Sequence, residues 1–168
     1  MAEHFNESNL LLKYESGRMS SQCFYRETCS LCEIELPYED FCRAWSSVFD
    51  HDSTVDLSFL SFLARNYTLV LLSNTNEIHF AFMRGQYPIL RAFHHFALSF
   101  QIGVMKPGKD IYLAALNLAH VNACEAFYAD DMKSYVDTAL ALGFTAACVS
   151  TKDGLIEAML LNGITPPL

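Results

Sequence analysis

The stretch Thr68-Leu-Val-Leu-Leu-Ser-Asn-Thr-Asn76 decides the fold of this chain, because it joins a short apolar run to a cluster of hydroxyl and amide side chains. Apolar runs of this length are typical of strands that are buried on both faces in a parallel sheet. Ala126-Phe-Tyr-Ala129 has the same character, and Phe96–Ser99 and Thr145–Val149 are weaker candidates. We therefore predict a parallel sheet in which Thr68–Leu72 and Ala126–Ala129 are interior strands.

Helical patterns fill the intervals between these strands. Ile111, Ala115 and Leu118, for example, share one helix face at i, i+4 and i+7. Strands that alternate with helices of this length form right-handed crossover units, so the fold class is α/β, with a Rossmann-like parallel core and helices on both faces. The predicted helices are Glu77–Arg84, Asp110–Ala119, Ser134–Leu142 and Asp153–Leu161, and Gly143 and Gly163 stand where helix C-caps are expected.

The first part of the chain has helical periodicity throughout. Gly17 is a stop signal, Ser20 is a candidate N-cap, and Pro37 opens a further helix. We predict three short helices between Phe5 and about Trp45. The expected organisation is a helical cap over residues 1–52, followed by an α/β core over residues 53–168.

Composition narrows the function classes. The net charge is −8 and Lys and Arg form no run, which argues against nucleic acid and against anionic membranes as partners. The longest apolar stretches are far too short to span a bilayer. No secretory signal is visible at the start, so we expect a cytoplasmic protein with reduced thiols. Cys29 and Cys32 form a C-x2-C pair, but the absence of a matching second pair favours buried thiols over a zinc site.

Chemically useful side chains follow three of the predicted elements. Ser73 and Asn74 come after the first strand and can donate to phosphate oxygens. Lys106 places a cation beside a proline turn, and Asp130-Asp131 ends a strand with two carboxylates, the ligands that Mg2+ prefers. Because ligands bind at the carboxyl ends of parallel strands, these groups together predict an anion site, a positive charge and a cation site on one sheet edge.

These segments resemble the second, third and fourth motifs of the haloacid dehalogenase superfamily. The matching stretches are Leu71-Leu-Ser-Asn-Thr-Asn76, Gly103-Val-Met-Lys-Pro107 and Phe127-Tyr-Ala-Asp-Asp131. Tyr14-Glu-Ser-Gly-Arg-Met-Ser20 is similar to the small helical cap of one branch, which includes sugar-phosphate phosphatases, haloacid dehalogenases and the amino-terminal domains of some epoxide hydrolases. The resemblance runs from about residue 5 to residue 164.

The resemblance implies a role for each matched residue. Ser73, helped by Asn74, would hold the transferring phosphoryl group, and Lys106 would balance the charge on nucleophile and phosphate. Asp131 would bind Mg2+ with Asp130 beside it. The implied activity is that of a magnesium-dependent phosphomonoesterase acting on a small phosphorylated metabolite. Dehalogenase chemistry is a subordinate option, because the carboxylate pair favours metal and hence phosphate.

One part of the family pattern is missing from this sequence. In the family the first strand ends in Asp-x-Asp-x-Thr, supplies the nucleophile and precedes the cap, whereas here the cap-like sequence begins almost at Met1. His51-Asp-Ser-Thr-Val-Asp56 has two carboxylates, but it follows the cap and fits better as the start of the next helix. The family's first strand lies centrally, so we expect a gap between Thr68–Leu72 and Ala126–Ala129.

This missing segment shapes the expected function. An amino-terminally truncated gene product would explain it, and we expect the chain as written to be inactive and to bind Mg2+ weakly if at all. The first alternative is a non-catalytic phosphate- or metal-binding regulatory protein. A flavodoxin-like domain with an unrelated ligand is a third reading. Tyr135 also departs from the pattern, because many relatives carry Asn there.

Overall fold

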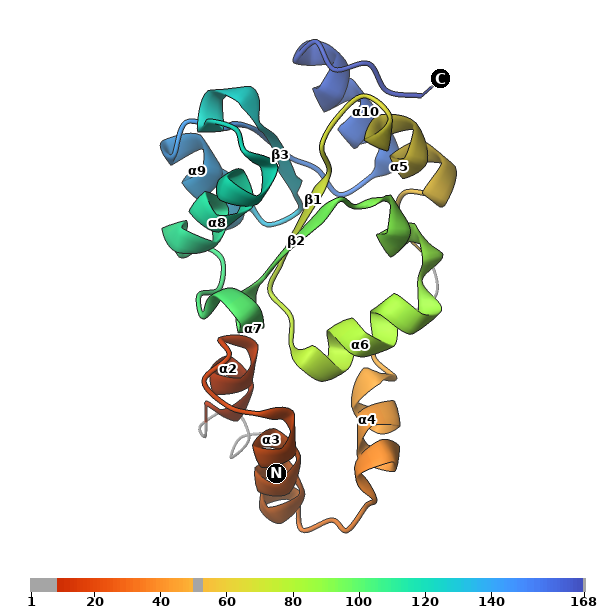
Figure 1. Cartoon of the computed structure of the whole chain (residues 1–168), viewed down its shortest axis with the longest axis vertical. Helices are drawn as coiled ribbons and strands as arrows, with labels where there is room; N and C mark the ends of the chain where they lie inside the picture. The colour runs from red at the N-terminus through yellow and green to blue at the C-terminus, as the bar shows by residue number, and fades with distance from the viewer. Residues whose placement is uncertain (1–8, 50–52, 168) are drawn as a thin grey trace.

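The computed structural model describes residues 9–49 and 53–167. Figure 1 shows an elongated molecule with a helical segment at one end and an α/β part at the other. The helical segment contains α2 (Leu10–Glu15), α3 (Ser21–Cys32) and α4 (Tyr38–Ser46), which confirms the three predicted helices. The cap boundary that we place at residue 52 lies outside the described residues.

The helical segment is ordered by the local signals that its sequence contains. The Ser20 hydroxyl caps α3 by accepting a hydrogen bond from the Cys23 N–H at 3.3 Å, and Pro37 stands directly before α4. An aromatic cluster fills the space between the helices, with the Tyr14 and Phe24 rings stacked at 4.3 Å. Ile78 belongs to the same cluster, so this core also joins the helical segment to the α/β part.

The α/β part alternates strands and helices as the sequence predicts. Its elements are α5 (Leu57–Ala64), β1 (Val70–Ser73), α6 (Glu77–Gln86), the 3-10 helix Pro88–Ala92, β2 (His95–Leu98), α7 (Ser99–Ile102), α8 (Lys109–Ala119), the 3-10 helix Ala123–Glu125, β3 (Phe127–Asp130), α9 (Lys133–Ala141), β4 (Thr145–Cys148) and α10 (Lys152–Leu161). The predicted strands and helices are all present, with bounds shifted by up to two residues. Ser99, expected to end a strand, instead begins α7.

The strands form two separate parallel pairs. In the first pair Val70 lies opposite His95, and in the second Phe127 lies opposite Thr145. Within the part of the chain that the structure describes, β1 and β3 are not hydrogen-bonded to each other. A cavity of about 460 Å³ lies beside both strands instead, and its lining includes Leu72 and Tyr128.

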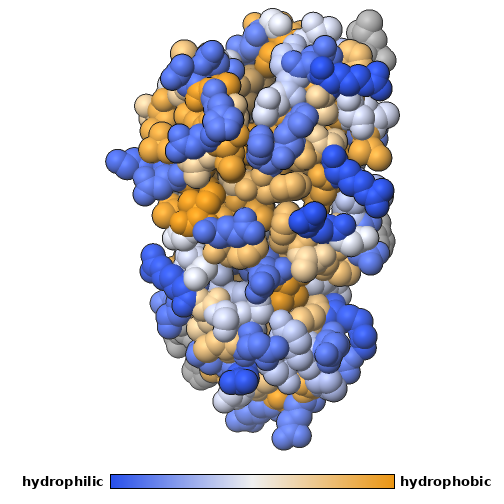
Figure 2. Space-filling model, in the orientation of Figure 1, coloured by the Kyte–Doolittle hydropathy of each residue, from blue (hydrophilic) through white to orange (hydrophobic). Residues whose placement is uncertain are grey.

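The burial of β1 and β3 differs from the sequence prediction. We predicted strands buried on both faces, but every residue of β1 is only half-buried, and Tyr128 is the one buried residue of β3. The cavity beside β1 and β3 leaves their facing sides short of packing partners. Figure 2 shows hydrophobic residues gathered over the centre of the α/β part, where Figure 1 places these strands.

The helices of residues 9–49 and 53–167 include none that is long and apolar enough to cross a membrane.

Helix α8 is closely packed within the α/β part, because its residues Ile111 and Tyr112 have no exposed surface. Ala115, on the predicted apolar face, is buried as well. Helix α8 therefore anchors the strand ends that carry the candidate site.

Candidate functional site

The end of β1 and the turn before α8 are fastened together by one side chain. The Asn74 amide nitrogen donates to the Lys106 carbonyl at 3.0 Å, and its oxygen accepts from the Lys106 N–H at 2.7 Å. Asn74 thus fixes the Lys106 backbone from both sides. The sequence predicts Asn74 as a helper in phosphate binding, and the structure shows it positioning the lysine.

Lys106 and Asp130 form an ion pair at this place. The Lys106 Nζ lies 2.6 Å from Asp130 Oδ2, and each side chain is only 9% exposed. The other carboxylate oxygen of Asp130 accepts from the Met132 N–H at 2.9 Å. Burial by itself would raise the pKa of Asp130, but the hydrogen bonds from Lys106, Tyr128 and Met132 outweigh it and hold the pKa below its ordinary value.

Two tyrosines frame this ion pair, and the sequence did not single out either as a site residue. The Tyr135 ring centre lies 4.8 Å from Lys106 Nζ, a cation–π distance, and the Tyr128 hydroxyl donates to Asp130 Oδ2 at 2.6 Å. Burial, together with the Asp130 carboxylate, raises the pKa of Tyr128, so it remains a neutral donor. Tyr128 looks like an ordinary apolar strand residue in the sequence, whereas Tyr135 had one signal, its departure from the family pattern.

Ser73 stands slightly apart from this arrangement. It is the last residue of β1, half-buried, and its hydroxyl makes a long contact of 3.5 Å with the Asn74 carbonyl. A contact at this distance is weak and leaves the hydroxyl able to donate elsewhere. The neighbouring Thr75 N–H binds the buried Ser99 hydroxyl at 3.0 Å, which ties the loop after β1 to the start of α7.

The two adjacent aspartates differ in what they can offer a metal ion. Asp130 already accepts hydrogen bonds from Lys106, Tyr128 and Met132, whereas Asp131, the residue after β3, is exposed. Carboxylates suit Mg2+, which also keeps several waters. Across the described ranges, no three His, Cys, Asp or Glu side chains gather closely enough to hold a metal. Asp131 is thus the available ligand, and Asp130 is a secondary one.

Asp56, which follows the helical segment, does not belong to this site. Asp56 is the N-cap of α5: its Oδ1 accepts from the Phe59 N–H at 2.8 Å, and its Oδ2 pairs with Lys152 at 2.8 Å. This confirms its predicted capping role. His51 and Asp52 lie outside the described residues.

The sequence is similar to that of a known phosphatase. The chain is 26% identical over 148 residues to a D-ribitol-5-phosphate phosphatase from Bacteroides thetaiotaomicron, and the alignment covers 84% of this chain and 72% of the relative. No family model matches the sequence.

Solved structures share the fold. A HAD family enzyme from Bacteroides thetaiotaomicron superposes with a TM-score of 0.84 at 23% identity, over 94% of this chain and 82% of that one. The wild-type form of the same enzyme has also been solved in complex with magnesium and inorganic phosphate, and this structure gives a TM-score of 0.82 at 24% identity, over 90% of this chain and 80% of that one. A predicted HAD-like family hydrolase from Porphyromonas gingivalis gives a TM-score of 0.78 at 28% identity, over 91% of this chain and 78% of that one.

Proposed function

We propose that this chain, which belongs to the haloacid dehalogenase superfamily, is by ancestry a magnesium-dependent phosphomonoesterase for a small phosphorylated metabolite. The observation that carries the proposal is the ion pair of Lys106 and Asp130 beside Asn74 at the strand ends. Phosphoryl transfer requires chiefly an aligned nucleophile and positive charge around the phosphate oxygens, and Lys106, which Asn74 holds in place and which pairs with Asp130, is the cation at that edge. The similarity to a ribitol-phosphate phosphatase supports a sugar- or polyol-phosphate substrate.

We further propose that these 168 residues alone do not turn over a phosphate ester. Asp130 is the carboxylate that contacts Lys106, and its oxygens already accept hydrogen bonds from Lys106, Tyr128 and Met132. It is therefore poorly placed to attack phosphorus. A nucleophilic aspartate would have to come from a strand that lies between β1 and β3, where the 460 Å³ cavity is.

The test is hydrolysis of para-nitrophenyl phosphate by the purified chain with Mg2+. We expect a rate no greater than that of buffer with metal, because orientation without a nucleophile supplies only binding. An Asp131→Ala variant is the control for contaminating enzyme, since contamination would survive the substitution. Metal-dependent turnover that Asp131→Ala abolishes would overturn the proposal of inactivity.

A second candidate is a non-catalytic protein that binds phosphate or a phosphorylated metabolite. It is favoured by the same occupied Asp130, because a site without an available nucleophile can still hold an anion beside Lys106 and Ser73. Binding of orthophosphate, measured by 31P NMR line broadening, would support this role if Lys106→Met removes it. Orthophosphate binding that is indifferent to Lys106 would count against both candidates.

A further inference from the structure

Helix α6 is joined to the helical segment at His79, a residue that the proposed hydrolase chemistry does not use. His79 lies in the first turn of α6 and is half-buried. Its Nε2 lies 3.0 Å from the Trp45 carbonyl oxygen in α4, and its ring stacks on the Trp45 ring with 5.5 Å between the ring centres. The Phe49 ring meets the imidazole edge-on at 4.7 Å. His79 therefore connects a helix of the α/β part with a helix of the helical segment.

The Asn76 side chain determines which nitrogen of His79 carries the proton. Asn76 caps α6, and its Oδ1 accepts a hydrogen bond from the His79 N–H at 3.0 Å. Because the amide oxygen is used by this cap, the amide nitrogen faces His79 Nδ1, at 3.1 Å. Nδ1 must therefore accept, and the single ring proton of neutral His79 lies on Nε2, which donates to the Trp45 carbonyl.

A second proton on His79 does not fit this arrangement. An imidazolium donates from both ring nitrogens, so its Nδ1–H would point at the NH2 group of Asn76. Asn76 has no exposed surface and is also hydrogen-bonded to the Glu15 side chain of α2, and turning its amide over would break the cap of α6. Burial likewise lowers the pKa of His79, while the hydrogen bond to the Trp45 carbonyl acts in the opposite direction.

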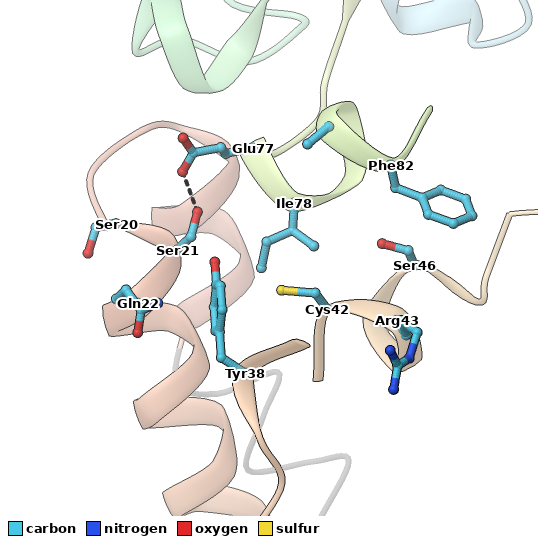
Figure 3. Close-up of a pocket in the computed structure, with 11 residues that line it drawn as sticks. Ser20, Ser21, Gln22, Tyr38, Cys42, Arg43, Ser46, Glu77, Ile78 and Phe82 are labelled. Carbon is cyan, nitrogen blue, oxygen red and sulfur yellow. Dashed lines mark hydrogen bonds between the residues drawn. The ribbon is translucent and has the colours of Figure 1, made fainter. Parts of the chain in front are cut away.

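The carboxylates around the junction are bonded to other groups than the imidazole. Glu15 of α2 is linked to His79 through Asn76. Figure 3 shows that Glu77, on α6 itself, is turned toward Ser21 of α3, whose hydroxyl donates to it. Among the described residues, no carboxylate is hydrogen-bonded to the His79 ring. A charged imidazolium would therefore gain no direct ion pair in this place.

We propose that His79 is a pH-sensitive latch between α4 and α6, which holds the two helices together when its ring is neutral and releases them when the ring is protonated. The protonated ring must move away from the Asn76 amide, and this movement takes it out of its stack on Trp45. The latch requires no nucleophile and no metal, so it stands independently of the proposed phosphatase function.

The latch should strengthen the junction at neutral pH and weaken it in mild acid. The pKa of His79 in the folded chain lies below the value of about 6.5 that a histidine has in an unfolded chain. The stabilisation is therefore complete above about pH 6.5 and is lost as the pH falls through the folded pKa, because the unfolded chain then binds more protons.

The fluorescence of Trp45 tests the release, because Trp45 is the single tryptophan of the chain and lies at the junction. As the pH of the whole chain falls from about 8 to about 5, we expect quenching by acrylamide to increase and the emission to shift to longer wavelength, since released helices expose the indole. Far-UV circular dichroism at each pH should show constant helix content. Helix content that falls in step with the quenching would overturn the proposal, because it would indicate global unfolding.

Variants assign the change to the His79 ring. His79→Gln should make the quenching independent of pH over this range. His120→Asn is a control that replaces an exposed histidine of the α/β part with a residue that tolerates its left-handed backbone. Glu15→Gln is a second control, which removes the charge of the carboxylate next to Asn76. Both controls should keep the pH-dependent step.

NMR of the histidine rings tests the latch without a substitution, so the proposal stays falsifiable if His79→Gln does not fold. The His79 ring is identified by its nuclear Overhauser contact with Trp45. We expect the Nε2–H tautomer at neutral pH and a pKa below about 6.5. An Nδ1–H tautomer, quenching of the unmodified chain that does not change with pH, or a step that survives His79→Gln would overturn the proposal.

Discussion

At the scale of single residues, the pairing of Lys106 with Asp130 dominates the candidate site. Both side chains are 9% exposed, and Tyr128 adds a hydrogen bond to the same carboxylate oxygen. Removing one partner of a buried pair leaves a charge without compensation. The pair should therefore matter for stability as well as for chemistry.

We predict that Asp130→Asn lowers the free energy of unfolding by about 3 kcal/mol in urea denaturation at neutral pH. Asp137→Asn is the matched control, because Asp137 pairs with Lys133 in a pair whose side chains are 54% and 79% exposed. Exposed pairs of this kind contribute at most about 1 kcal/mol. Equal losses in the two variants would contradict a special role for the buried pair.

The same substitution should change the response of stability to pH. The pKa of Asp130 in the folded chain is below its ordinary value, so its stabilisation is present above the unfolded pKa of about 4 and disappears as the pH falls through the folded pKa. The stability difference between the unmodified chain and Asp130→Asn should accordingly shrink as the pH drops below about 4. A difference that is constant from pH 7 down to pH 2 would show that the carboxylate charge is not its cause.

The two aspartates at the end of β3 should contribute unequally to metal binding. We expect Mg2+ binding to be weak and to depend on Asp131 more than on Asp130, because Asp130 is occupied by Lys106, Tyr128 and Met132. Isothermal titration of the unmodified chain, Asp131→Asn and Asp130→Asn would measure this. Tight binding that survives Asp131→Asn would remove the proposed metal role of that residue.

At the scale of elements, one glycine decides how α2 packs against the α/β part. Gly17 follows α2 with a φ of +68°, and a Cβ at this position would lie 2.1 Å from the carbonyl oxygen of Phe100 in α7. The clash is with backbone, which cannot turn aside as a side chain can. The sequence marks Gly17 as a helix stop, and the structure adds that it is a close contact between two parts of the molecule.

We predict that Gly17→Ala lowers the melting temperature and destabilises the fold by more than about 1–2 kcal/mol, the cost of the left-handed backbone alone. Gly85→Ala is the control, since Gly85 lies within α6 with open space around it and should gain up to about 1 kcal/mol from better helix propensity. Differential scanning calorimetry of both variants checks the contrast. A Gly17→Ala chain as stable as the parent would mean that α2 and α7 are not held in this contact.

At the scale of the whole molecule, β1 and β3 belong to two separate strand pairs with a cavity beside them. The cavity beside β1 and β3 has a largely apolar lining, which includes Leu72, Ala129 and Phe144. Strands leave backbone groups unsatisfied along an unpaired edge, and buried backbone groups require partners. A strand placed between β1 and β3 would pair with both and bury this apolar surface.

We predict that fusing a strand segment with an Asp-x-Asp motif ahead of Met1 raises the melting temperature and creates phosphatase activity. The added strand pairs backbone groups and buries apolar surface, while its aspartate reaches the edge that holds Lys106. Thermal melts and phosphate release should be compared with those of a nucleophile Asp→Asn fusion, which should keep the stability and lose the turnover. A fusion no more stable than the parent chain would show that β1 and β3 do not accept a strand between them.

Much of this architecture was determined by the sequence alone. The cap at Ser20, the apolar runs at β1 and β3 and the helical faces such as that of α8 are local signals, and local signals depend on spacing and residue type. The order of Ser73, Lys106 and Asp130 along the chain likewise predicts their places after β1, before α8 and at β3, because chain order and strand direction determine which ends share an edge.

Only the tertiary structure decided what those residues do to one another. The Asn74 side chain is hydrogen-bonded to the Lys106 backbone, and the Tyr135 ring lies at a cation–π distance from the Lys106 ammonium group. Asp130, and not Asp131, forms the ion pair with Lys106. These contacts join residues that are far apart in the chain, and their directions depend on side-chain rotamers and packing that no periodicity encodes. The half-burial of β1 could not be predicted from the sequence for the same reason, because the residues of a strand are the same whether or not other parts of the chain pack against both of its faces.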